Sequence, residues 1–224
     1  MHVKISATSV YALIAVLGYA KADATGPTFN TGHVSSGIYI LEAISTLILP
    51  DSPRGSTGTL LLSAGMDTAA GEDIIRFEAT NSDSTWDVLA YTLIQTPANT
   101  RAPIPVPNTA ASPGDHVTMH YVYDESSQKY TQYIILNGND VSNRTAGEAE
   151  AKSWGSFVTC QDQGTCGTVP SHQWIDTKIT LSDADPAYGS TLVKSQGVTG
   201  DLKSKDGGVT WSSSQFKIPE YTFK

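Results

Sequence analysis

Short apolar runs alternate with turn residues along most of the chain. Most runs are rich in Val, Ile, Thr, Tyr and Leu, and HVTMHYVY and YTQYIIL alternate between apolar and polar positions. That period of two is typical of strands with one buried face. Loop residues such as SPRGSTG, NSDST and KSKDGG lie between the runs. We expect strands within residues 37–50, 58–67, 73–80, 85–97, 115–124, 130–138, 155–159, 173–181, 190–198 and 214–223.

Helical patterning is almost absent. Only AGEAEAKSW, residues 146–154, has a helix-leaning composition, and it is short. Ten or more short strands without a dividing linker predict an all-β fold. The expected architecture is a two-sheet antiparallel β-sandwich of the jelly-roll, concanavalin-like type.

The N-terminus has the pattern of a secretory signal. A basic start is followed by an apolar run, Val10 to Ala20, and small residues at Ala20 and Ala22, or at Ala22 and Ala24, have the spacing of a cleavage site. The run is too short to span a bilayer comfortably, and no later stretch is long and apolar enough. We therefore predict a signal peptide at residues 1–22, a single secreted domain at residues 23–224, and a monomer.

The charge balance limits the partners. The chain has 14 basic and 22 acidic residues; loss of Lys4 and Lys21 with the signal leaves 12 against 22, about −10. Such a chain repels the phosphates of nucleic acid and of anionic membranes. We expect neither as a partner, whereas an acidic medium would reduce the self-repulsion.

Two motifs suggest covalent features of an exported protein. Cys160 and Cys166, in CQDQGTC, predict a small disulfide across a turn. Asn143 begins the sequon Asn143-Arg144-Thr145, which predicts a glycan if it is exposed.

Several kinds of catalytic site are disfavoured. No G-x-S-x-G elbow is present for a serine hydrolase. His116 and His120 would share a strand face, but no third ligand is near, so we expect no metal and no cofactor. Glycosidase chemistry needs two carboxylates across a cleft, whereas acidic residues such as Asp183 and Asp185 fall in turns.

Several segments, in order, resemble the fungal glutamic peptidases, the eqolisin or A4 peptidase family. GIYILEAISTLILP resembles an early strand, and GTLLLSAGMDTAAGEDIIRFEA resembles the strands leading to the family's catalytic glutamine. TWDVLAYTLIQTP resembles an aromatic strand, and SPGDHVTMHYVYDESSQKYTQYIILNGNDV a hairpin that opens with a Gly-Asp turn. CGTVPSHQWIDTKITLSD resembles the strand with the catalytic glutamate.

The resemblance implies a sandwich fold and a glutamate base that works with a glutamine amide on a water molecule. The glutamine position falls on Arg76 and the glutamate position on Gln173, so both catalytic residues are substituted. An amide cannot serve as a general base. Glu78, which shares a strand face with Arg76, is one possible substitute, although an ion pair with Arg76 or Lys178 is the simpler expectation. Asp176 is another, but three residues from Gln173 it should point to the opposite face of a regular strand.

We therefore expect a secreted, fungal-type pseudoenzyme that binds a polysaccharide or a polypeptide in a retained groove. Two alternatives stay open: an active acid endopeptidase of the glutamic type, and a lectin-like or glucanase-like module. Tyr121 and Tyr123 should share a face, whereas Trp86 and Tyr91 should point to opposite faces, so at least one of these two should pack internally. The groove candidates are Arg76, Glu78, Trp86, Tyr91, Tyr121, Tyr123, Tyr133, Gln173 and Trp174.

Overall fold

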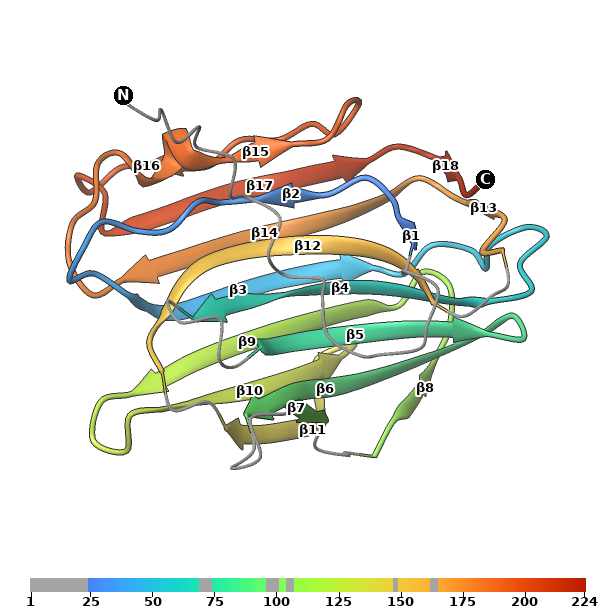
Figure 1. Cartoon of the computed structure of the whole chain (residues 1–224), viewed down its shortest axis with the longest axis horizontal. Coiled ribbons are helices and arrows are strands. Elements are labelled where there is room, and N and C mark those ends of the chain that lie inside the picture. Colours follow the sequence, from blue (N-terminus) through green and yellow to red (C-terminus); the bar gives the residue numbers. More distant parts are fainter. Residues whose placement is uncertain (1–23, 69–73, 96–100, 104–106, 147–148, 162–164) are drawn as a thin grey trace, which may run out of the picture.

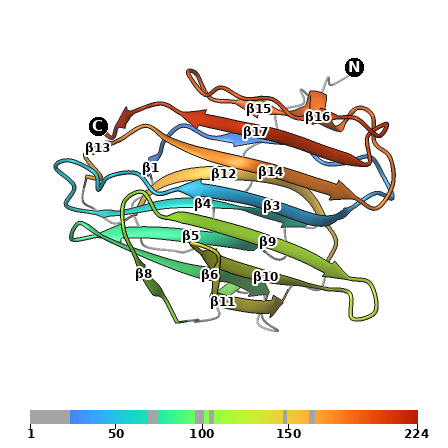
Figure 2. The same ribbon diagram turned by 180° about the vertical axis from the view of Figure 1, so that it is seen from behind.

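Two antiparallel sheets face each other in the computed structural model (Figure 1; Figure 2 gives the reverse view). The structure describes residues 24–68, 74–95, 101–103, 107–146, 149–161 and 165–224. The predicted signal peptide lies outside these residues. No helix within them is long and apolar enough to cross a membrane.

The first sheet faces the viewer in Figure 1 and has the strand order β15-β2-β12-β4-β5-β6-β7, with β1 paired to β12 and β8 to β6. Its middle strands β4, β5 and β6 follow one another in sequence as a meander. The bounds are β1 Ala24–Thr25, β2 Phe29–Asn30, β4 Thr59–Thr68, β5 Ile74–Ser82, β6 Thr85–Gln95, β7 Arg101–Pro103, β8 Thr109–Ala111, β12 Ala151–Gln161 and β15 Val193–Lys194.

The second sheet has the order β11-β10-β9-β3-β14-β17-β16 and faces the viewer in Figure 2. A two-stranded ribbon, β13 with β18, lies apart from both sheets, and one 3-10 turn, η1, follows β14. The bounds are β3 Ile40–Ile48, β9 His116–Asp124, β10 Lys129–Leu136, β11 Asn139–Ala146, β13 Thr168–Val169, β14 His172–Leu181, η1 Tyr188–Thr191, β16 Lys203–Ser204, β17 Thr210–Ile218 and β18 Tyr221–Thr222.

Alternating strand positions form the core between the sheets. In β9, Val117, Met119 and Tyr121 are buried while their neighbours point outward. Phe29 of the first sheet stacks on Phe216 of the second with ring centroids 4.1 Å apart. Burial of such large rings removes much apolar surface from water and is the main force that holds the sheets together.

Two buried polar side chains tie the sheets at fixed positions. The Tyr121 hydroxyl donates to the Ala64 carbonyl at 2.8 Å. Gln132 of the second sheet donates through Nε2 to the Thr92 hydroxyl of the first at 2.7 Å. Because buried donors need partners, these bonds favour one relative placement of the sheets.

The expected all-β, two-sheet antiparallel sandwich is confirmed, as is the disulfide between Cys160 and Cys166. The helix-leaning interpretation of residues 146–154 is wrong for its second half, because β12 begins at Ala151. There Ala151 and Trp154 are buried, so packing of the sheet outweighs the weak local preference for a helix.

Candidate functional site

Arg76 and Glu78 project from the outer face of the first sheet. Phe77 between them is buried in the core, where its ring lies nearly perpendicular to that of Trp174 with centroids 6.4 Å apart. Because side chains alternate along a strand, the residues on either side of Phe77 must point outward. The predicted shared face of Arg76 and Glu78 follows directly from this period of two.

The two side chains form an ion pair, as the simpler expectation had it. Arg76 donates through Nε to Glu78 Oε1 at 2.7 Å, and its Nη2 lies 2.5 Å from the same oxygen. The guanidinium also lies over the ring of Tyr91, the cross-strand neighbour of Arg76, with its carbon 4.7 Å from the ring centroid. One cation is thus held by both a carboxylate and an aromatic face.

Burial dominates the electrostatics of this pair. The Glu78 side chain is only 6% exposed although it lies on the outer face of its sheet. Burial raises the pKa of the Glu78 carboxyl above its ordinary range, and the Arg76 charge opposes that rise. Burial, together with the Glu78 charge, also raises the pKa of Tyr91. Glu78 therefore keeps its proton to a higher pH than a solvent-exposed glutamate.

Two glycines lie beside this pair in one cross-strand row. Gly65 is the partner of Arg76 on one side and of Gly155 on the other, and Gly155 is the partner of Asn30. A Cβ on Gly65 would lie 2.5 Å from the Arg76 Cβ, and one on Gly155 would lie 1.9 Å from Asn30 Oδ1. The backbone of β5 thus leaves no room for a side chain at Gly65, where the Ile75 carbonyl oxygen would lie 2.4 Å from a Cβ, and the Asn30 side chain fills the space over Gly155.

Sequence reasoning missed Asn30, Gly65 and Gly155 as members of this site. The available signal was a glycine in the interior of each strand pattern, LLSAGMD and SWGSF, since such glycines often mark a close approach of another group. Asp67 was missed too; it lies one row away on the same face, with Oδ2 3.9 Å from His33 Nε2.

Gln173 does not join Arg76. It lies in β14 of the second sheet, whereas Arg76 lies in β5 of the first. Its neighbour Trp174 points into the core, so Gln173 faces outward from the other side of the sandwich, where its Oε1 accepts a hydrogen bond from Gln215. The expectation that Arg76 and Gln173 line one groove is wrong, because the core separates them.

Asp176 also lies on that opposite sheet. A β-bulge between Ile175 and Lys178 interrupts its pairing with β3, and Asp176 adopts a positive φ of 52°. The extra residue shifts the alternation, so Asp176 is exposed although a regular strand would have turned it inward. Asp176 is too far around the molecule to serve as a base beside Arg76.

The aromatic candidates divide among several environments. Trp86, Tyr121 and Trp174 are fully buried core residues, and the Trp86 indole donates to the Pro50 carbonyl at 3.0 Å. Tyr91 is on the outer face of the first sheet, so the predicted opposite faces of Trp86 and Tyr91 are confirmed. Tyr133 is partly exposed on the outer face of the second sheet, near His120.

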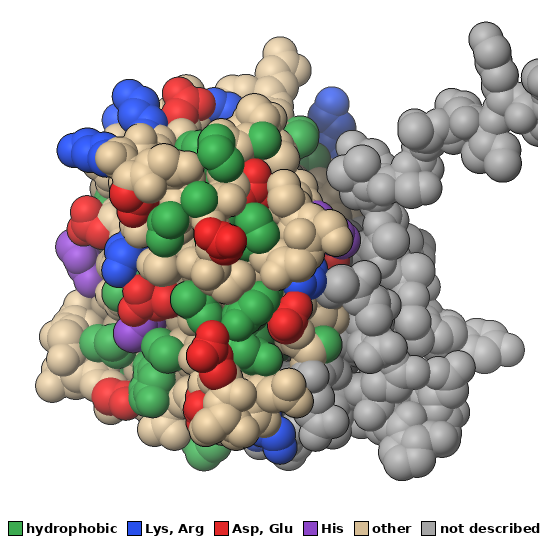
Figure 3. Space-filling model, turned by 90° about the vertical axis from the view of Figure 1, so that its left-hand side faces the viewer, with side chains coloured by type: hydrophobic (Ala, Val, Ile, Leu, Met, Phe, Trp, Pro, Cys, Tyr) green, Lys and Arg blue, Asp and Glu red, His purple; other side chains and the backbone are tan. Residues whose placement is uncertain are grey.

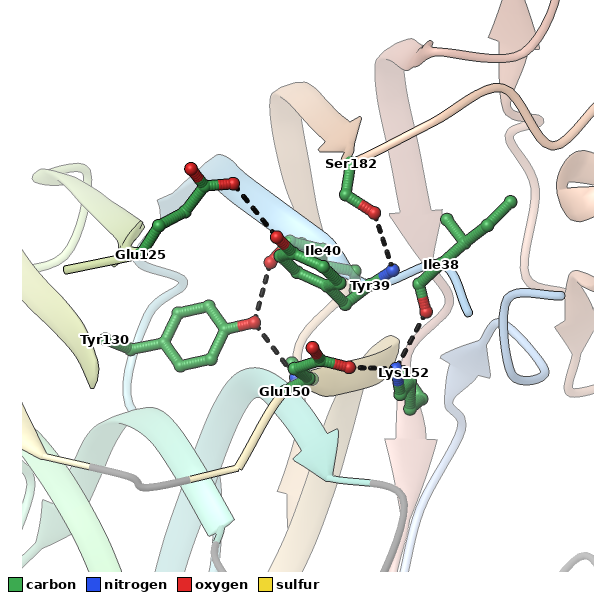
Figure 4. A network of polar contacts seen from close by, with 9 residues as sticks. Ile38, Tyr39, Ile40, Glu125, Tyr130, Glu150, Lys152 and Ser182 are labelled. Atoms are coloured by element: carbon green, nitrogen blue, oxygen red, sulfur yellow. Dashed lines mark hydrogen bonds and ion pairs between the residues drawn. The ribbon is translucent and has the colours of Figure 1, made fainter. Parts of the chain in front are cut away.

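Tyr123 lies near the C-terminal end of β9, whose arrowhead is at the left of Figure 1. It contacts Tyr130 and Tyr39, with ring centroids 4.8 and 5.2 Å away. Figure 4 shows the surrounding polar network, in which Lys152 bridges Glu150 at 2.6 Å and the Ile38 carbonyl at 2.8 Å. In the same network the Tyr130 hydroxyl of β10 donates to the Ile40 carbonyl of β3 at 2.6 Å and accepts from the Ala151 N–H of β12 at 2.9 Å, so the network joins the two sheets at this end. Figure 3 shows hydrophobic and acidic side chains interspersed over it.

The two strand histidines do not form a metal centre. His116 is exposed, whereas His120 lies 2.8 Å from Glu42 through Nε2. Within the described residues, no group of three or more His, Cys, Asp or Glu side chains could hold a metal ion.

Arg76, Glu78 and Tyr91 are therefore the members of the predicted groove set that the structure brings together. The arrangement offers a guanidinium, a buried carboxylate and, over Gly155, the amide of Asn30. It contains no carboxylate paired with a side-chain amide among the described residues, because the Glu78 partner is a cation.

Comparisons with known proteins show the fold. No model of a protein family and no curated protein matches the sequence. Scytalido-glutamic peptidase, solved with a peptide-based transition state analogue, aligns over 86% of this chain and 98% of its own, with a TM-score of 0.51 and 13% identity. SCP-B, an eqolisin peptidase solved with the tripeptide Ala-Ile-His, gives the same coverage and TM-score with 14% identity. The sandwich therefore has the fold of the glutamic peptidases.

Proposed function

We propose that this chain is a secreted binding protein without peptidase activity, which holds an extended polypeptide on the outer face of its first sheet. The observation that carries the proposal is the Arg76–Glu78 ion pair stacked on Tyr91. Among the described residues of this site, no carboxylate is paired with a side-chain amide. A carboxylate engaged by a guanidinium is poorly suited to take a proton from water.

The choice of a polypeptide over a polysaccharide rests on the surface itself. Sugar rings are usually held on open aromatic faces. Among the described residues of this face, Arg76 covers the ring of Tyr91. The aromatic side chain that remains beside the two glycines is Phe157 of β12. By contrast, Asn30 and Arg76 flank the two glycines and offer the donors and the acceptor that a peptide backbone requires. The peptide ligands of the two structural neighbours agree with this choice.

The ion pair further predicts that binding depends on pH. When Glu78 takes up a proton, Arg76 loses its partner and can pair with a carboxylate of the ligand. The raised pKa of Glu78 means that this release begins above the ordinary range of a glutamate. A peptide α-carboxyl, with a pKa of about 3.5, is still ionised there. We therefore expect tightest binding in mildly acidic solution.

The test compares two labelled peptides. The fluorescein-labelled peptide Ala-Val-Thr-Ala-Leu is titrated with residues 23–224 between pH 3 and 7, as the free acid and as the C-terminal amide, and anisotropy is followed. The free acid should bind more tightly near pH 5 than at pH 7, and Glu78→Gln should bind it at pH 7. Gln215→Ala, on the opposite face, is the control. Equal binding of acid and amide at every pH would contradict the role of Arg76.

A second variant tests the row of glycines without removing a charge. Gly155→Ala adds a methyl that would lie 1.9 Å from Asn30 Oδ1 and 2.8 Å from its Cγ, so the Asn30 side chain must move. The methyl would also lie 3.1 Å from the Phe29 carbonyl oxygen, so β2 must shift slightly. We expect at least tenfold weaker binding with a modest loss of stability, about 1–3 kcal/mol. Unchanged affinity in a folded Gly155→Ala protein would show that the peptide binds at another surface.

One observation favours an active acid endopeptidase as a second candidate. Glu78 has a buried carboxyl with a raised pKa on the outer face of the first sheet. A perturbed pKa of this kind is a common property of catalytic acids and bases. Cleavage of oxidised insulin B chain between pH 2 and 5 by wild type, abolished in Glu78→Gln, would establish this function in place of simple binding. Gln173→Glu is no test, because it would add a carboxylate to the opposite face.

A further inference from the structure

One cross-strand row on the outer face of the second sheet leads to a further site. Asn143 of β11 is paired with Tyr133 of β10, which is paired with His120 of β9. Asn143 is exposed and begins the Asn-X-Thr sequon. β11 ends the strand order of this sheet, and no described strand pairs with its other edge.

We propose that Asn143 carries an N-linked glycan whose first sugar lies on the ring of Tyr133 and shields the edge of the second sheet. Directly paired side chains have Cβ atoms about 4.5–5.5 Å apart, so a sugar on the Asn143 amide is within reach of the neighbouring ring. Aromatic faces pack well against the apolar face of a sugar ring. Tyr133 accordingly serves this glycan rather than a free ligand.

The neighbours of Tyr133 leave one side of its ring for the sugar. On the side away from Asn143, the His120 ring lies with its centroid 6.0 Å from that of Tyr133. His120 Nε2 lies 2.8 Å from Glu42 Oε1, and Lys178 Nζ donates to Glu42 Oε2 at 2.9 Å. These contacts fix the side chains on one side of Tyr133, and on its other side the row ends at Asn143.

Strand β11 is also suited to carry such a group. The sequon residue Thr145 bonds through its hydroxyl to that of Thr131 at 2.8 Å, which fixes the strand and keeps Asn143 outward. An unpaired strand edge can template pairing with another chain, and a bulky hydrophilic group beside it opposes that contact. The inference is independent of the peptide-binding proposal, but it does require export.

The first test asks whether the glycan is attached. Residues 23–224 are secreted from insect cells behind a host signal, and the peptide containing Asn143 is examined by mass spectrometry. Wild type and Thr145→Ser, which keep the sequon, should carry the glycan, whereas Asn143→Gln and Thr145→Ala should not. An unmodified Asn143 in the secreted wild-type protein would overturn the proposal.

The second test asks whether the sugar contacts Tyr133. Tm is measured for wild type, Asn143→Gln, Tyr133→Leu and the double variant, all from the same cells. Loss of the glycan should lower Tm by about 2–4 °C when Tyr133 is present, and much less when it is Leu, for a contact of ordinary strength. Trimming the wild-type glycan to its first sugar should preserve its Tm. Equal Tm losses in both backgrounds would overturn the stacking contact.

Discussion

Glu78 on the outer face of the first sheet and Glu42 on that of the second both have a basic partner, yet their pKa values shift in opposite directions. On the first sheet, burial raises the pKa of Glu78 in spite of Arg76. On the second sheet, the hydrogen bond from Lys178 lowers the pKa of Glu42, and the bond from His120 acts in the same direction. The Glu78 side chain is 6% exposed, whereas that of Glu42 is 31% exposed. The balance between desolvation and pairing with basic side chains decides the direction: desolvation is the larger cause at Glu78, and the bond from Lys178 is the larger cause at Glu42.

This difference gives the two faces different responses to acid. For Glu78 the folded protein binds its proton more tightly than the unfolded chain, so its contribution to stability falls as pH rises through the raised pKa. For Glu42 the contribution is present above the ordinary glutamate pKa and is lost as pH falls through the lowered one. The face with the proposed binding site is therefore adapted to acidic solution, and the opposite face to neutral solution.

The largest effect should come from removing the cation of the buried pair. Arg76→Met leaves the Glu78 carboxylate buried without its partner, which should cost about 3–5 kcal/mol of unfolding free energy at pH 7. At pH 3.5 the protonated Glu78 needs no cation, so the loss should shrink to about 1 kcal/mol or less. Urea unfolding at both pH values measures the difference. A loss of the same size at both would mean that packing against Tyr91, not charge, is the source.

A smaller effect of opposite sign is expected from Glu78→Gln. Because the raised pKa means that the folded protein prefers a neutral Glu78, the amide should match wild type at pH 3.5 and be more stable at pH 7, by about 1 kcal/mol. The buried His172, whose pKa is lowered to about 4 by desolvation, contributes equally to both proteins. Urea unfolding between pH 3.5 and 7 gives the comparison. A variant that is less stable than wild type at pH 7 would show that the ion pair outweighs burial.

The sequence could predict the faces of strands but not their partners. Alternation in HVTMHYVYD correctly predicted that Tyr121 and Tyr123 share a face, and the spacing of two between Arg76 and Glu78 predicted their contact. Such relations depend only on the local period of a strand. They hold wherever the strand lies in the sheet.

The placement of Gln173 shows where this reasoning ends. β14 pairs with β3 and β17, whereas β5 pairs with β4 and β6, and no local pattern specifies these distant partners. At Asp176 a single inserted residue reverses the face that spacing predicts. The members of a site that spans strands therefore depend on topology, and only those within one strand were predictable.

The smallest effect should come from the exposed face, through Lys178→Met. The side chains of Lys178 and Glu42 are 47% and 31% exposed, so solvent screens their pairing and its loss should cost less than about 1 kcal/mol at pH 7. The loss should be smaller at pH 2 than at pH 7, because Glu42 takes up its proton as the pH falls through its lowered pKa, and it should weaken in 0.5 M NaCl. Unfolding free energies at the two pH values, with and without salt, measure it. A loss at pH 7 as large as that of Arg76→Met would mean that Glu42 depends on its cation as Glu78 does, and the contrast between the faces would fail.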